Sequence, residues 1–85
     1  MSDPHGKIEP MTPETLLAFE AAHPRQTGMK ETAIRRELGI GPARYYMLLN
    51  RAAVSAEGMK ADPITARRVR ERAQYRVARR AVRVA

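Results

Sequence analysis

The strongest constraint on the fold is the segment from Asp62 to Ala85, where eight arginines stand against two acidic residues. Its apolar side chains are small and recur at helical spacing, at Ala66, Val69, Ala73, Val77, Ala81 and Val84. This pattern predicts an amphipathic helix with a narrow apolar stripe and little apolar surface to bury. Asp62 as N-cap and Pro63 in the first turn predict its start. Running through Arg83, the helix would be roughly 30 Å long at 1.5 Å per residue.

The positive charge is concentrated in this segment. The whole chain has 85 residues, a net charge of +7 and a sequence pI near 10.8, and residues 62–85 alone carry +6. Arginine supplies 13 of the 16 basic residues. A compositional bias toward arginine would raise it everywhere, but it would not confine the net charge to one end. The asymmetry therefore favours an acidic partner such as nucleic acid.

Several classes of protein are excluded by composition. The chain has no cysteine, which rules out disulfide scaffolds and thiolate chemistry, and its two histidines, His5 and His23, are too few for a histidine metal site. No phosphate-binding glycine loop and no nucleophile with a histidine partner are present. We expect no enzyme activity, no cofactor and no metal. The N-terminus lacks a signal peptide and no apolar run could span a membrane, so we expect a soluble, cytoplasmic protein.

Three further helices are predicted before the basic segment. Thr12 and Pro13 open a helix over 13–22, which His23-Pro24 ends, and Leu16, Leu17, Phe19 and Ala21 form its apolar face. A second helix covers 29–38 and ends at Gly39 as a left-handed C′ residue. A third opens at Gly41-Pro42 and runs to about residue 53, with Tyr45, Leu48, Leu49 and Ala52 as its buried stripe. Residues 54–61 are predicted as a connector with at most one helical turn.

The expected fold is therefore all-α: a disordered lead-in (1–11), a three-helix core like a helix-turn-helix domain (12–61) and an arginine-rich helix (62–85). The helix-turn-helix pattern supports this. When Gly39 is taken as the ninth position, the motif requires apolar residues at five positions. The chain has apolar residues at all five: Ile34, Leu38, Ile40, Tyr45 and Leu48. The fifth position departs from the pattern, because it holds Arg35 instead of a small residue. An ordinary helical hairpin is the alternative.

Two groups of side chains are candidates for DNA contacts. The third helix would present Arg44, Tyr46, Asn50 and Arg51, since arginine bonds guanine, asparagine bonds adenine and tyrosine reaches phosphates. Three of them have a structural alternative: Tyr46 would complete the core, Asn50 would cap the helix end and Arg51 would be a solvated charge. The long helix would supply phosphate contacts from Arg67, Arg68, Arg70, Arg72, Arg76, Arg79 and Arg80.

Specific residues also carry a resemblance. Lys30–Arg35, Arg44-Tyr45-Tyr46 with Leu49-Asn50, Ala61–Pro63 and Arg67–Arg70 together resemble a family of small actinobacterial proteins described as a domain of unknown function. Some members are associated with the mycobacterial nucleoid, so the resemblance implies DNA binding with little sequence preference. The family often has bulky aromatic residues where this chain has Ala21–Pro24, which implies a shorter or differently packed first helix here.

The leading prediction is a duplex-DNA-binding protein, nucleoid-associated or transcription-regulatory, with low sequence specificity. The alternative is a protein-interaction module that docks on the transcription machinery and contacts nucleic acid secondarily. RNA binding is a variant with few aromatic stacking platforms, and binding to a membrane surface is disfavoured because the apolar stripe is Ala and Val. The same stripe leaves two options open, packing back on the core or pairing two chains as a homodimer.

Overall fold

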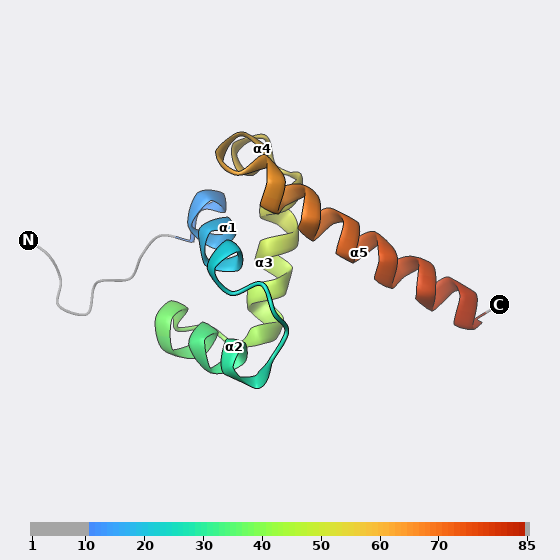
Figure 1. Ribbon diagram of the computed structural model, residues 1–85, viewed down its shortest axis with the longest axis horizontal. Coiled ribbons are helices and arrows are strands. Elements are labelled where there is room, and N and C mark those ends of the chain that lie inside the picture. The colour runs from blue at the N-terminus through green and yellow to red at the C-terminus, as the bar shows by residue number, and fades with distance from the viewer. Residues whose placement is uncertain (1–10, 85) are drawn as a thin grey trace, which may run out of the picture.

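The computed structural model describes residues 11–84, with side chains as far as Val82 (Figure 1). Within that range the chain is helical and contains no strand, which confirms the all-α prediction. The elements in order are α1 (Pro13–Ala22), α2 (Gly28–Ala33), the π-helical turn η1 (Ile34–Leu38), α3 (Pro42–Val54), α4 (Ala56–Ala61) and α5 (Pro63–Val84). Apart from Met11, which packs against the core, the predicted lead-in lies outside the described residues.

Helix α1 has the bounds that its capping residues predicted. The Thr12 side chain accepts a hydrogen bond from the Thr15 backbone N–H at 3.1 Å, and Pro13 occupies the first helical position. His23 ends the helix with non-helical dihedral angles (φ −131°, ψ 67°), as a residue before proline should. Local capping chemistry is therefore sufficient to fix this element.

The second helix differs from its prediction. It begins at Gly28, one residue earlier than expected, because the Thr27 side chain caps it by accepting from the Lys30 backbone N–H at 3.2 Å. Its last five residues form η1, a π-helical turn instead of a regular α-helical one. Gly39 then ends it in the left-handed conformation, with φ 73°, as predicted.

The predicted connector contains an additional helix, the short α4. Ser55 organises its start, since its Oγ donates to the Ala52 carbonyl at 2.8 Å and accepts from the Gly58 N–H at 2.9 Å. Asp62 then caps α5 by accepting from the Thr65 N–H at 3.0 Å. The chain therefore turns from α3 into α5 through two consecutive capped helix starts.

Gly58→Ala should destabilise the fold by about 1–3 kcal/mol, because this turn has no room for a side chain. A Cβ at Gly58 would lie 2.0 Å from the Ala52 carbonyl oxygen and 3.0 Å from its carbon. Chemical denaturation would measure the loss. Gly28→Ala is the matched control, since a Cβ there meets nothing within 4 Å. Equal stability of the two variants would show that the α3–α4 turn opens without cost.

The hydrophobic core joins α1, η1, α3 and the first two turns of α5. Its buried side chains are Leu16, Leu17, Phe19, Ile34, Tyr45, Leu49, Ala52, Ala53, Ala66 and Val69. Two predicted core positions differ: Ala21 is exposed, and Leu48 is half-buried against the core. The other helix-turn-helix positions, Leu38 and Ile40, also pack partly against it.

The long helix divides into a buried and an exposed half. Ala66 and Val69 are buried, Ala73 is half-buried, and every side chain from Gln74 to Val82 is exposed. Figure 1 shows this distal part extending away from the other helices. We call residues 74–84 the arm. The apolar stripe of the arm does not pack back on the core: Val77 is 65% exposed.

Candidate nucleic-acid interface

The arginines of α5 are not spread around its circumference. Successive residues of an α-helix are about 100° apart, so five of the seven arginines whose side chains the structure describes in α5 fall within a sector of about 120°. They are Arg68, Arg72, Arg76, Arg79 and Arg80, and we call this sector the basic face. Ala73, Val77 and Ala81 occupy the neighbouring sector, where Arg70 also lies, while Arg67 lies outside both. The helical phase therefore gives α5 one strongly cationic side.

The orientation of the basic face is fixed by a buried carboxylate on α1. Glu20 is 2% exposed, and its oxygens accept from Lys30 Nζ at 2.8 and 3.0 Å, from the Tyr45 hydroxyl at 2.6 Å and from Arg72 Nη1 at 3.0 Å. Lys30 is equally buried. This cluster, which we call the Glu20 network, links α1, α2, α3 and α5. Arg72 belongs both to the Glu20 network and to the basic face. The basic face is therefore turned toward α1 at the point where the arm begins.

Gln26 and Tyr46 extend the network toward the surface. The hydroxyl of Tyr46, which is half-buried, hydrogen-bonds the side-chain amide of Gln26. When the amide nitrogen faces Tyr46, the amide oxygen accepts from Arg72 Nη1 at 2.9 Å and from Lys30 Nζ at 3.3 Å. Two predicted DNA-binding residues, Tyr46 and Arg72, thus have partners within the protein. Each of these contacts holds its side chain in place within the fold.

Burial raises the pKa of Glu20, but the hydrogen bonds from Lys30, Tyr45 and Arg72 outweigh it, and the net pKa lies below its ordinary value. Burial, followed by the hydrogen bond to the Glu20 carboxylate, raises the pKa of the Tyr45 hydroxyl far above its ordinary value. Tyr45 therefore stays protonated and serves as a permanent donor to Glu20. The network has one anion, two cations and a neutral hydroxyl.

The depressed pKa of Glu20 predicts acid sensitivity. A carboxylate whose pKa is lower in the folded state stabilises the fold above its unfolded pKa, and that stability is lost as pH falls through the folded pKa. The free energy of unfolding should therefore decline on acidification below about pH 4.5, the ordinary value for Glu. Urea denaturation from pH 7 to pH 3 would measure it. Glu20→Gln should flatten this decline, whereas Glu14→Gln, on the exposed side of α1, should leave it unchanged.

Two further arginines have partners outside the basic face. Arg70 Nη1 donates to the Ala53 carbonyl at 2.9 Å, where it satisfies one of the last carbonyls of α3. Arg67 Nε donates to Glu71 at 3.1 Å in an exposed i, i+4 pair. Arg70 is therefore engaged in holding α5 on α3, and Arg67 faces away from the basic face. Among the α5 side chains that the structure describes, the free cations are Arg68, Arg76, Arg79 and Arg80, all exposed.

The α3 candidates lie apart from these cations. Arg44, Asn50 and Arg51 are exposed, and Arg44 and Arg51, seven residues apart, share one side of α3. Asn50 lines a shallow groove of about 180 Å³ between α3 and α5, beside Arg70. The predicted base-reading set is therefore divided between two sides of the helix.

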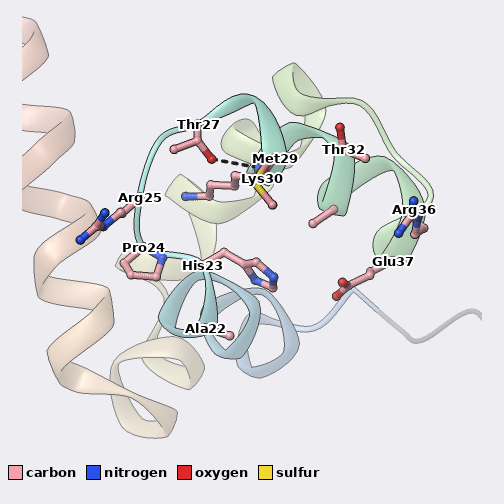
Figure 2. A pocket seen from close by; sticks show the side chains of 11 residues that line it. Ala22, His23, Pro24, Arg25, Thr27, Met29, Lys30, Thr32, Arg36 and Glu37 are labelled. Atoms are coloured by element: carbon pink, nitrogen blue, oxygen red, sulfur yellow. Dashed lines mark hydrogen bonds between the residues drawn. The ribbon is translucent and has the colours of Figure 1, made fainter.

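Sequence reasoning missed the residues that set this geometry. They include Glu20, Gln26 and Lys30. Two partners of Glu20, Tyr45 and Arg72, lie 25 and 52 residues from it, and no local pattern pairs residues at such separations. Arg25, in the connection between α1 and α2, was also missed, and Figure 2 shows it directed toward α5. It is exposed, so it adds a cation beside the base of the basic face. Arg25 lies near α5 because it directly precedes Gln26, whose side-chain amide contacts Arg72 of α5.

Between residues 11 and 84, no helix has both the length and the apolar character that crossing a membrane requires.

Comparison with known proteins gives a match to a family model. No curated protein and no solved structure matches the chain. The model of a family described as "Protein of unknown function (DUF3263)" matches residues 11–83, from the start of α1 through the arm. This confirms the predicted resemblance as far as a domain of unknown function, and the chain belongs to the DUF3263 family.

Proposed function

We propose that this protein binds double-stranded DNA through the basic face of α5, with low sequence specificity, in a nucleoid-associated or transcription-regulatory role. The observation that carries the proposal is the alignment of Arg68, Arg76, Arg79 and Arg80 on one exposed side of a helix. The proposal includes no catalysis and no cofactor.

The electrostatics of the arm support this proposal. No acidic residue follows Glu71 in the sequence, so nothing within the arm neutralises its arginines. Closely spaced like charges on a helix repel one another, and a polyanion relieves that repulsion. Arg79 lies 5.7 Å from the centre of the Tyr75 ring, which leaves its guanidinium at the surface. Phosphates along a duplex supply the regular negative charge that such a row would bind.

The division of the α3 candidates favours low specificity. Base recognition in the major groove needs several side chains that enter together. Here Arg44 and Arg51 share one side of α3, and Asn50 borders the α5 groove. Phosphate contacts position a protein without reading sequence, and the arginines of the arm outnumber the base-reading candidates.

A salt titration tests the proposal. Arg25 and the four free cations of α5 give about four to five phosphate contacts, so log affinity for a random duplex should fall with log salt at a slope of about −4. Fluorescence anisotropy on two unrelated duplexes, with single-stranded DNA and RNA competitors, would measure it. Similar affinities and slopes on both duplexes are expected. No binding at low ionic strength would refute the proposal and favour an acidic protein partner, and stronger competition by RNA would reassign the polyanion.

A further inference from the structure

An open cleft of about 710 Å³ lies between the end of α1 and the α2–η1 segment (Figure 2). Its volume is in the range of small-molecule sites. Ala22, Pro24, Met29 and Ala33 contribute apolar lining, and Met29 is 82% exposed at its edge. The basic face of α5 does not contribute to the lining, so the cleft is separate from the proposed DNA interface.

The charges of the cleft are arranged unevenly. Lys30 lines it, but its ammonium is bound by Glu20, and Arg25 is directed toward α5. Arg36 and Glu37 line the opposite end, and neither forms an ion pair with another described residue. At this end the cleft therefore has a cation and an anion that have no ion-pair partner among the described residues, together with an apolar wall.

The π-helical turn η1 is what places these two charges. Arg36 and Glu37 are its third and fourth residues. A π turn has a wider hydrogen-bonding pattern than an α-helix, so it changes the direction of the side chains it contains. Such turns are rare and occur frequently at functional sites. In Figure 2 both side chains lie on the same side of the cleft.

His23 adds a further polar side chain to the lining of the cleft. Figure 2 shows its ring extending into the cleft, and the ring stacks on Phe19 with centroids 4.2 Å apart. Its Nδ1 lies 3.1 Å from the Phe19 carbonyl oxygen. Because a carbonyl only accepts, Nδ1 carries the proton, and Nε2 is left to bond a ligand.

We propose that this cleft binds a free α-amino acid with an apolar side chain. The carboxylate would pair with Arg36, the ammonium with Glu37, and the apolar side chain would lie against Met29, Ala33 and Pro24. A ligand with a single charge would leave one of the two protein charges unmatched. The inference does not depend on DNA binding, because it uses none of the residues of the basic face.

Methyl NMR of the full-length protein, with L-leucine and L-phenylalanine as probes, tests this inference. The Met29 methyl should shift saturably, and those of Met47 and Met59, which lie outside the cleft, should not. 3-Phenylpropionate lacks the ammonium and phenethylamine lacks the carboxylate, so each should bind at least about fivefold more weakly than phenylalanine.

Matched variants complete the test. Arg36→Gln and Glu37→Gln should each weaken phenylalanine binding at least about fivefold. Arg35→Gln and Glu31→Gln make the same charge changes on exposed neighbours that do not line the cleft, and they should retain the wild-type affinity. The inference is overturned if no amino acid shifts Met29, if the single-charge analogues bind as tightly as phenylalanine, or if the two pairs of variants behave alike.

Discussion

Glu20→Ala is expected to lower the free energy of unfolding by about 3–5 kcal/mol, because it removes one partner from a buried ion network. The Lys30 ammonium, 2% exposed, would remain in the core without its counterion, and the Tyr45 hydroxyl would lose its acceptor. A folded chain of this length has a total stability of roughly 4–13 kcal/mol, at about 0.05–0.15 kcal/mol per residue. The loss is therefore a large fraction of the total stability, and the variant should unfold at a clearly lower temperature and urea concentration than the wild type.

Thermal and urea denaturation followed by circular dichroism would measure this loss. Glu14→Ala removes the same type of side chain from the exposed side of α1, and it should change stability by less than about 0.5 kcal/mol. The double variant Glu20→Leu/Lys30→Met removes both buried charges and should be more stable than Glu20→Ala. If Glu20→Ala matches Glu14→Ala, the network contributes nothing, and the core alone holds the helices together.

The network also determines how the arm is attached. Arg72 is the arginine of α5 that bonds a buried group of α1, and it lies one helical turn before Arg76 on the same face. Arg70 adds a second attachment, to the end of α3. Both were predicted as DNA contacts from composition, because sequence alone does not distinguish an arginine that binds a partner in the fold from one that is free.

Elements with local signals were predicted well from the sequence. Thr12 and Pro13 set the start of α1, Gly39 ends η1 and Asp62 caps α5, since in each case the cap is formed by residues within one turn. The π-helical turn was not predicted, because its residues Ile34–Leu38 have an ordinary helical composition. Helix α4 was only partly anticipated, since it depends on Ser55 and on the close approach of Gly58 to Ala52.

Predicting the proposed interface required information on distant contacts as well as on the periodicity of the sequence. The phase of the arginines on α5 follows from their spacing alone and could have been derived from the sequence. The direction of that face could not, because it depends on the contact between Arg72 and Glu20, which are 52 residues apart. The same holds for Tyr46, whose hydroxyl is bound to Gln26 across two elements.

Replacing Arg76, Arg79 and Arg80 together with glutamine should weaken binding to random duplex DNA by about two to three orders of magnitude at 0.1 M salt. Each lost phosphate contact removes about 0.9 from the slope of log affinity against log salt, so the slope should fall from about −4 to between −1 and −2. The three side chains are exposed and make no described ion pair, so the fold should remain intact. Anisotropy titrations at several salt concentrations would measure both quantities.

A charge-matched variant separates the position of the charge from its amount. Arg35→Gln, Lys60→Gln and Arg67→Gln together remove three exposed positive charges that lie off the basic face. Those charges act on the duplex only at long range, where salt screens them within about 10 Å at 0.1 M. This control should weaken binding by less than tenfold and leave the slope near −4. Equal losses in the two triple variants would mean that net charge, and not the aligned face of α5, attracts the DNA.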